Sequence, residues 1–255
     1  MIFLKSRQEI ELMRTANRIV SEILMELREQ VVPGISTGEV DKISAELIKK
    51  KGARSAFKGY QIRSGVPPFP ATICISLNNE VVHGIPSPQR TIREGDVVSL
   101  DFGVIYKDFY GDAAITFFLG NPNDEVQRLI QATAEALEAG IEQSQVGNRI
   151  GDISAAVQER VEKEGFAVVR EFVGHGVGRR LHEDPPVPNY GVRERGMRLR
   201  EGMVLALEPM VNTGGPEVMM KNDGWTAVTK DGSLSAHFEH SVAITEKGPV
   251  VLSRL

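Results

Sequence analysis

The sequence predicts an α+β fold in which helices cover a mainly antiparallel sheet. Two observations lead to this prediction. A pair of amphipathic helix patterns occurs in each half of the chain, and each pair is followed by short β-rich segments bounded by turn residues. No segment has the composition of an interdomain linker, so residues 1–255 are expected to form a single catalytic domain.

The first helix pair is defined by its capping residues. Ser6 with Glu9 makes one capping box, and Ser36 with Glu39 makes another, each followed by apolar residues at helical spacing. Gly52 is expected to end the second helix, because glycine readily adopts the left-handed conformation that terminates helices.

A second helix pair is predicted over about 124–143 and 152–164. Its turn and cap residues align with those of the first pair at an offset of 113 residues. The matched glycines are Gly34 and Gly147, Gly38 and Gly151, and Gly52 and Gly165. Both an internal duplication and chance would explain these matches, since turns restrict the choice of residue.

Strands are predicted after each helix pair, at 96–105, 113–119, 203–211, 225–229 and 234–245. The first two are expected to pair as an antiparallel hairpin bounded by Gly95, Gly111 and Gly120. The last two are expected to pair about Asp231-Gly232, because Asp-Gly is a strong hairpin signal.

Composition argues against nucleic-acid binding, membrane contact and a thiolate-rich metal site. With 30 Lys plus Arg and 34 Asp plus Glu, the net charge is −4, which does not favour a direct role with nucleic acid. The absence of a long apolar run or a signal-peptide pattern predicts a cytoplasmic protein without membrane contact. The single cysteine, Cys74, excludes a thiolate-rich metal site, so any metal should be bound by oxygen and imidazole.

Acidic residues occur inside otherwise apolar strand segments. Asp101 lies in VVSLDFGV, Glu208 in VLALEPMV and Glu239 in LSAHFEHSVAI. A buried carboxylate is unfavourable unless a cation or hydrogen bonds compensate it. Strand alternation lets Asp101 and Asp112 converge across the hairpin, where a divalent cation would relieve their repulsion. The alternative, a solvated hairpin end, suits Asp112 better than Asp101.

The segment GHGVGRRLHEDP contains His175 between two glycines and His182 seven residues later. Glycines on both sides suggest a close approach of backbone to a ligand, whereas a structural histidine in a flexible loop is the alternative. A nucleotide-binding loop is disfavoured because the spacing is not GxGxxG. Several embedded acids with one glycine-framed histidine suit two divalent cations.

At these residues the chain closely resembles methionine aminopeptidase, in its compact bacterial type I form, along essentially its whole length. The motifs that carry the resemblance are NEVVHGIP with His83, LDFG with Asp101, YGDAA with Asp112, GHGVG with His175, LHEDP with His182, LEPM with Glu208 and FEHSV with Glu239. The resemblance implies the pita-bread fold, whose two similar halves would account for the repeat. The short spacing between Glu208 and Glu239 leaves no room for the helical insertion of type II enzymes.

The resemblance also implies a metal-binding role for five residues. Asp101 would chelate one of two divalent ions, which in this family are Co, Mn, Fe or Zn. Asp112 and Glu239 would bridge the two ions. His175 and Glu208 would complete the coordination of the second.

The implied catalytic residues are Glu208, His182 and His83. Glu208 would accept a proton from the attacking water, His182 would hydrogen-bond the substrate carbonyl, and His83 would contact the scissile amide. A monovalent cation, Na or K, is also implied near the carbonyls of Asn79, Val81 and Ser235.

The implied reaction is removal of the initiator methionine from nascent polypeptide N-termini at the ribosome, by a monomer that prefers a small second residue. By position, the residues expected to contact the methionine are Phe69, Cys74, His83, His182 and Trp225, with Tyr60 as a further candidate. Ordinary core packing is the alternative role for Phe69 and Cys74.

Three departures from the family pattern affect the expected methionine pocket and leave the metal-binding and catalytic residues unchanged. Leu181 precedes His182 where phenylalanine is usual, Val82 replaces a frequent cysteine, and the segment 61–72 is longer than usual.

Two other functions are alternatives to methionine removal. A proline-directed peptidase of the same fold, such as prolidase or aminopeptidase P, usually carries an additional N-terminal domain. A catalytically silent peptide-binding protein would be expected to have lost metal ligands, whereas all five are present.

Overall fold

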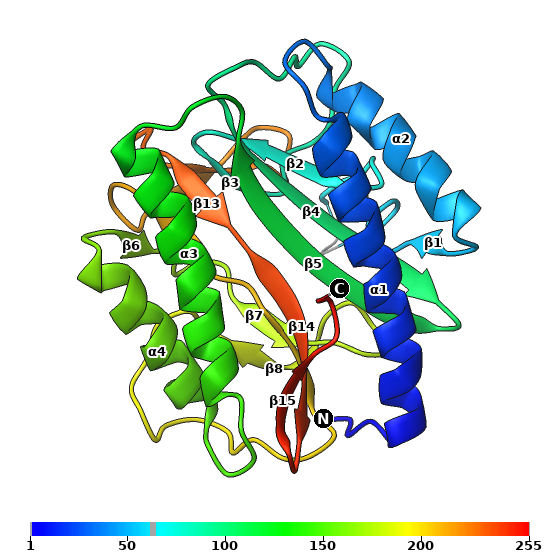
Figure 1. Ribbon diagram of the computed structural model, residues 1–255, viewed down its shortest axis with the longest axis vertical. Helices are drawn as coiled ribbons and strands as arrows, with labels where there is room; N and C mark the ends of the chain where they lie inside the picture. Colours follow the sequence, from blue (N-terminus) through cyan, green and yellow to red (C-terminus); the bar gives the residue numbers. More distant parts are fainter. Residues whose placement is uncertain (1, 62–64, 255) are drawn as a thin grey trace.

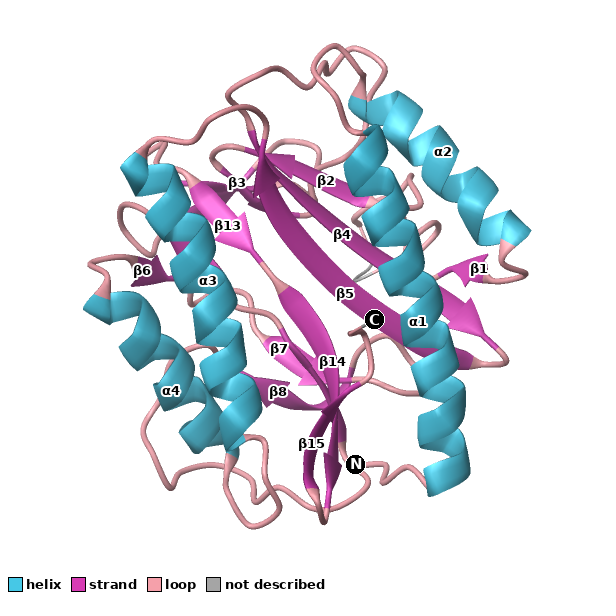
Figure 2. Cartoon of the chain, viewed as in Figure 1, coloured by secondary structure: helices cyan, strands magenta, loops and turns pink. Residues whose placement is uncertain are grey.

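The computed structural model describes residues 2–61 and 65–254, and within them four helices cover one face of a nine-stranded sheet (Figure 1). Two three-stranded sheets complete the β-structure, and all four helices lie on the same side of the strands (Figure 2). None of the helices in these ranges combines the length and apolarity that a membrane crossing requires.

The helices begin at the capping residues that the sequence indicates. They are α1 (Arg7–Gln30), α2 (Thr37–Lys50), α3 (Asp124–Gln143) and α4 (Ile150–Lys163). Both predicted capping boxes are present, with Ser6 and Ser36 as the N-cap residues. Helix α4 begins two residues before the predicted start, because Asp152 is its third residue and accepts a hydrogen bond from the Arg149 N–H (2.7 Å).

The large sheet has the order β1-β4-β5-β14-β9-β7-β8, with β2 also paired to β4 and β15 to β14. Its strands are β1 (Arg54–Ser55), β2 (Cys74–Leu77), β4 (Val97–Tyr106), β5 (Phe109–Phe118), β7 (Gly174–Gly176), β8 (Glu183–Val187), β9 (Val204–Leu207), β14 (Glu239–Thr245) and β15 (Gly248–Val251). One of the smaller sheets contains β6 (Ala167–Val168), β10 (Met210–Asn212) and β13 (Ser235–His237). The other contains β3 (Glu80–Val82), β11 (Val218–Met220) and β12 (Ala227–Thr229).

The repeat at an offset of 113 residues is visible in the backbone hydrogen bonds of the two halves. The Gly34 N–H donates to the Ile92 carbonyl at 2.8 Å. The Gly147 N–H, at the equivalent position, donates to the Leu199 carbonyl at 3.2 Å. Each half therefore ties the turn of its helix pair to the segment that precedes its sheet strands. This two-half α+β arrangement is the pita-bread fold.

The first hairpin has a shorter turn than the sequence predicts. Strands β4 and β5 pair along their whole length, and the turn is Lys107-Asp108, where both residues have positive φ (46° and 62°). Gly111 instead lies inside β5, where an added Cβ would lie 2.6 Å from the backbone of Ala16 in α1. The predicted hairpin is therefore confirmed, but the prediction that Gly111 bounds its second strand was wrong, because that glycine permits the close approach of a helix.

The single strand predicted over 203–211 was also wrong, because the structure has two strands there. Glu208 and Pro209 separate β9 from β10, which belong to different sheets. Proline has no N–H to donate to a strand ladder, so the ladder is interrupted at that residue. As a result, Glu208 lies just beyond the end of β9.

The hairpin predicted about Asp231-Gly232 does not form. Strand β12 pairs with β11 and β3, and β13 pairs with β10. The turn itself is present, because the Asp231 carboxylate accepts hydrogen bonds from the N–H groups of Gly215 (2.8 Å) and Ser233 (2.9 Å). A turn signal indicates where the chain reverses but does not determine which strands pair.

Candidate metal centre

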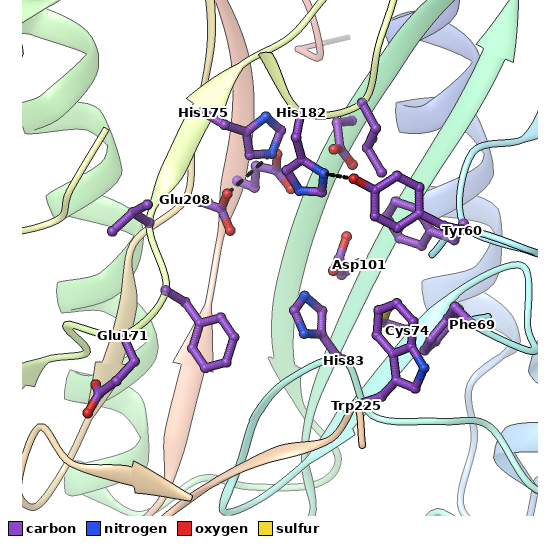
Figure 3. Close-up of a pocket in the computed structure, with 16 residues that line it drawn as sticks. Tyr60, Phe69, Cys74, His83, Asp101, Glu171, His175, His182, Glu208 and Trp225 are labelled. Carbon is purple, nitrogen blue, oxygen red and sulfur yellow. Dashed lines mark hydrogen bonds and ion pairs between the residues drawn. The ribbon is translucent and has the colours of Figure 1, made fainter. Parts of the chain in front are cut away.

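The residues predicted for the site line one cavity of about 440 Å³, over the strands on the side opposite the helices (Figure 3). They are Phe69, Cys74, His83, Asp101, Asp112, His175, His182, Glu208, Trp225 and Glu239, together with Tyr60. The structure therefore brings together side chains that are up to 179 positions apart in the sequence, as Tyr60 and Glu239 are.

Asp101 and Asp112 come from neighbouring strands of the first hairpin. Asp101 is opposite Ala114 and Asp112 is opposite Gly103, so both carboxylates project from the same face of the sheet. Gly103 leaves room for them, because an added Cβ would lie 3.3 Å from Asp112 Oδ1. This Oδ1 atom is buried and has no hydrogen-bond partner among the described residues. A buried carboxylate oxygen without a protein partner fits the role of a cation ligand.

Three further side chains, those of His175, Glu208 and Glu239, lie in the same part of the cavity as Asp112. Glu239 begins β14 beside β5, and ligand atoms of Asp112, His175 and Glu239 all lie within 4.8 Å of one another. His175 Nε2 is 3.4 Å from Glu208 Oε1. His175 Nδ1 is 2.9 Å from the Gly176 carbonyl, which leaves Nε2 available as a ligand.

The glycines beside His175 serve a purpose that the sequence did not indicate. An added Cβ at Gly174 would lie 2.4 Å from the Ala206 carbonyl oxygen, and one at Gly176 would lie 2.3 Å from the Asp184 carbonyl oxygen. The glycines therefore let β7 fit between its neighbouring strands. The prediction that they admit a ligand to the backbone was wrong, although they do fix the place of His175.

Burial dominates the electrostatics of the cavity. It raises the pKa of Asp101 to about 7 and raises the pKa values of Asp112, Glu208 and Glu239 well above their ordinary range, with neighbouring carboxylates as a further cause. Burial also lowers the pKa of His175 to about 3, so its imidazole is neutral. Four carboxylates and a neutral imidazole form a donor set that fits a pair of divalent cations, which would compensate the buried negative charge.

His182 lies at the edge of this centre. Its ring centroid is 4.2 Å from that of His175, and its Nδ1 atom is 2.5 Å from the Tyr60 hydroxyl (Figure 3). Burial raises the pKa of the Tyr60 phenol, which therefore keeps its proton. When this phenol donates to Nδ1, the ring proton of neutral His182 lies on Nε2.

His83 directly follows β3 and has a φ of 60°, in the left-handed region that non-glycine residues seldom adopt. Its ring packs edge-on against Trp225 (6.1 Å between centroids) and Phe172 (5.5 Å). Burial lowers its pKa to about 4, so the imidazole is neutral. Backbone conformations of this kind cost roughly 1–3 kcal/mol and occur preferentially at functional sites.

The apolar side of the cavity consists of aromatic rings and one thiol. Phe69 and Trp225 pack edge-on with centroids 5.1 Å apart, and the Trp225 Nε1–H donates to the Pro67 carbonyl at 2.8 Å. Cys74 is opposite Asp101 in the sheet and donates a hydrogen bond to its carboxylate. Leu181 also lines this side. Residues 62–64 of the long 61–72 segment lie outside the described residues.

Sequence reasoning missed the cavity residues Phe57, Glu171 and Phe172, and it also missed His237, which lies beside Glu208. His237 is 2% exposed, and its Nε2 lies 3.8 Å from Glu208 Oε2. Its position two residues before Glu239 was the available signal. Phe57 and Phe172 carry no sequence pattern that distinguishes them from core residues.

The model of metallopeptidase family M24 matches residues 11–246, so the chain belongs to this family of metal-dependent peptidases. Within it, the chain belongs to the methionine aminopeptidase family. It is 51% identical over 253 residues to the methionine aminopeptidase of Clostridium perfringens, covering 99% of both chains. It is 48% identical over 256 residues to that of Aquifex aeolicus, covering 100% of this chain and 99% of the other.

Solved structures give the same result. The methionine aminopeptidase of Thermotoga maritima superposes with a TM-score of 0.96 at 46% identity, and 100% of both chains is covered. The prolidase of Pyrococcus furiosus superposes with a TM-score of 0.79 at 24% identity, covering 99% of this chain and 65% of the other. This second similarity shows the shared fold alone.

Proposed function

We propose that this protein removes the N-terminal methionine from polypeptides whose second residue is small, as a single catalytic domain. The observation that supports this proposal best is the convergence of the five predicted ligands in one buried cavity beside an apolar pocket. Asp101, Asp112, His175, Glu208 and Glu239 would hold two divalent ions. When bound, such ions acidify a water molecule and polarise the substrate carbonyl.

Glu208 is the residue best placed to accept a proton. It lies between β9 and β10, and its two carboxylate oxygens face His175 (3.4 Å) and His237 (3.8 Å). Burial keeps both imidazoles neutral. Neither imidazole therefore places a positive charge beside Glu208 that would weaken this carboxylate as a base. Glu208 can therefore act as the general base for water addition to the first peptide bond.

His182 and His83 would position the substrate. With Tyr60 bound to Nδ1, the Nε2–H of His182 can donate to the carbonyl oxygen on which negative charge develops. His83, which lies between the metal ligands and Trp225, can contact the scissile amide (Figure 3). The thiol of Cys74 and the rings of Phe69 and Trp225 suit a thioether side chain.

The setting of the reaction is also part of the proposal. New polypeptide N-termini emerge at the ribosome, so we place the enzyme in the cytoplasm, acting on nascent chains as a monomer. A monovalent cation near Asn79, Val81 and Ser235 stays a prediction. The Asn79 carbonyl already accepts a hydrogen bond from the Thr229 N–H (2.9 Å), so a cation there would use its remaining lone pair.

A peptide assay tests the function against both rivals. With Mn(II) or Co(II), the protein should release methionine from Met-Ala-Ser and should not prefer Gly-Pro or other Xaa-Pro peptides. Preferred hydrolysis of Xaa-Pro peptides would favour a proline-directed peptidase. Metal binding without hydrolysis of any peptide would favour a silent peptide-binding protein.

Replacement of His182 by alanine is expected to lower kcat by about 10²–10³-fold, because a donor to the developing oxyanion is lost. Metal content should stay near that of the wild type, since His182 is not a proposed ligand. Steady-state kinetics and elemental analysis of the same preparation measure both quantities. Loss of metal together with activity would instead identify His182 as a ligand. Tyr60→Phe serves as a milder companion, since it removes only the hydroxyl that orients the ring.

A further inference from the structure

The N-terminal segment 2–6 makes a buried ion pair with the segment that carries His182. Lys5 Nζ lies 2.6 Å from Glu183 Oε2, and the two side chains are 6% and 4% exposed. The desolvation of two buried charges offsets much of their attraction, so such a pair contributes little net stability. Its presence between the first residues of the chain and the active-site region therefore suggests a role other than stability.

Glu183 also binds the turn that connects β7 with β8. Its Oε1 atom accepts hydrogen bonds from the backbone N–H groups of Arg179 (2.8 Å) and Arg180 (3.1 Å). This turn, residues 177–182, ends at His182, the residue directly before Glu183. One carboxylate thus binds two backbone N–H groups of the turn, which is also held by the Tyr110 N–H at the Gly178 carbonyl (2.9 Å). Lys5 in turn holds this carboxylate from outside the turn.

The space around the ion pair is closely fitted. An added Cβ at Gly178 would lie 2.4 Å from Lys5 Cε and 2.8 Å from Glu183 Oε1, so the two side chains lie directly against the backbone of the turn at this position. On the other side, the Lys5 N–H donates to the Gly202 carbonyl at 2.7 Å. Lys5 is therefore held by its backbone and its side chain at once.

We propose that Lys5 is a positioning residue that acts on His182 through Glu183 and the turn 177–182. The inference rests on the proposed function, because it assigns His182 a part in methionine release. The His182 ring must meet both the Tyr60 hydroxyl and the substrate, and its position depends on the backbone directly before Glu183. Displacement of a reacting group by about 1 Å can lower a rate by about 10²-fold.

The test compares Lys5→Met with Arg7→Met, a matched control. Arg7 lies two residues away, is exposed and is the first residue of α1. For Lys5→Met, we expect kcat for Met-Ala-Ser to fall by about 10- to 100-fold while KM and metal content change little. Arg7→Met should behave as the wild type. Hydrogen exchange of the amides in 177–182 should become faster in Lys5→Met alone, which gives a readout independent of activity.

A double-mutant cycle separates positioning from a general loss of stability. In the His182→Ala background, Lys5→Met should cause no further loss of kcat, because the residue through which it acts is absent. An equal additional loss in that background would overturn the proposal. If wild-type protein releases methionine and Lys5→Met retains its kcat, the positioning role fails while the proposed function stands. Absence of methionine release by the wild type would instead reject the function itself.

A second variant covers the case in which Lys5→Met does not fold because Glu183 is left as an unpaired buried charge. Lys5→Met combined with Glu183→Gln removes this charge and keeps an amide oxygen for the two backbone N–H groups. A folded double variant should show the same fall in kcat. Wild-type kcat in this variant would overturn the proposal.

Discussion

Replacement of Glu208 by glutamine is expected to lower kcat for Met-Ala-Ser by about 10²–10⁴-fold, because the amide cannot accept the proton of the attacking water. Glutamine matches the shape of glutamate, and Glu208 lies beyond the end of β9, so the fold should be retained. Steady-state kinetics, with circular dichroism as the check on folding, measures the effect. Retention of more than about a tenth of wild-type kcat would exclude Glu208 as the base, given the size of such effects.

Glu171→Gln is the matched control for this substitution. Glu171 also lines the cavity, but its side chain is exposed and points away from the other carboxylates (Figure 3). The same change of charge at this position should leave kcat within about twofold of the wild type. A comparable loss in both variants would show that net charge in the cavity, rather than one base, determines the rate.

Replacement of Asp112 by asparagine is expected to have opposite effects on activity and on the stability of the metal-free protein. Removing a proposed bridging carboxylate should release metal and lower methionine release by at least about 10²-fold. In the metal-free protein, burial and the neighbouring Asp101 raise the pKa of the Asp112 carboxyl. Its contribution to stability is therefore present at pH values below the unfolded pKa and is lost as the pH rises through the folded pKa.

At neutral pH, Asp112→Asn should accordingly raise the Tm of the metal-free protein, by about 2–4 °C for each kcal/mol gained. Thermal unfolding in the presence of a chelator, with and without added Mn(II), measures both effects. Asp108→Asn, in the exposed turn of the same hairpin, should change neither Tm nor metal content. A metal-free Asp112→Asn protein that is less stable than the wild type would contradict the electrostatic argument.

The helices and their ends were predictable because their signals are local. Ser6 and Ser36 each bond to a residue three positions later in the chain, and this contact is visible in the sequence as a spacing. The fold class and the two-half repeat follow from the same kind of signal. The convergence of Asp101 and Asp112 on one face of the hairpin was likewise predictable from strand alternation.

Three of the errors concern contacts between distant segments, whereas the single strand predicted over 203–211 overlooked the local signal of Pro209. Gly111 is a glycine because α1 approaches it, and Gly174 and Gly176 are glycines because neighbouring strands approach them. Asp231-Gly232 forms its turn, but the strands on either side pair elsewhere. In each case the sequence shows an unusual residue at the right position. The structural role of that residue depends on a distant segment of the chain, which the local sequence does not identify.

The sequence by itself determined the α+β class, the helix ends and, through the resemblance, the residues of the candidate site. Only the tertiary structure decided that Asp112 Oδ1 has no partner among residues 2–61 and 65–254, that Tyr60 bonds His182, and that Lys5 pairs with Glu183. The physical reason is the range of the interactions. Capping and alternation act between near neighbours in the chain, whereas burial, close approach and charge pairing depend on side chains that meet only after folding.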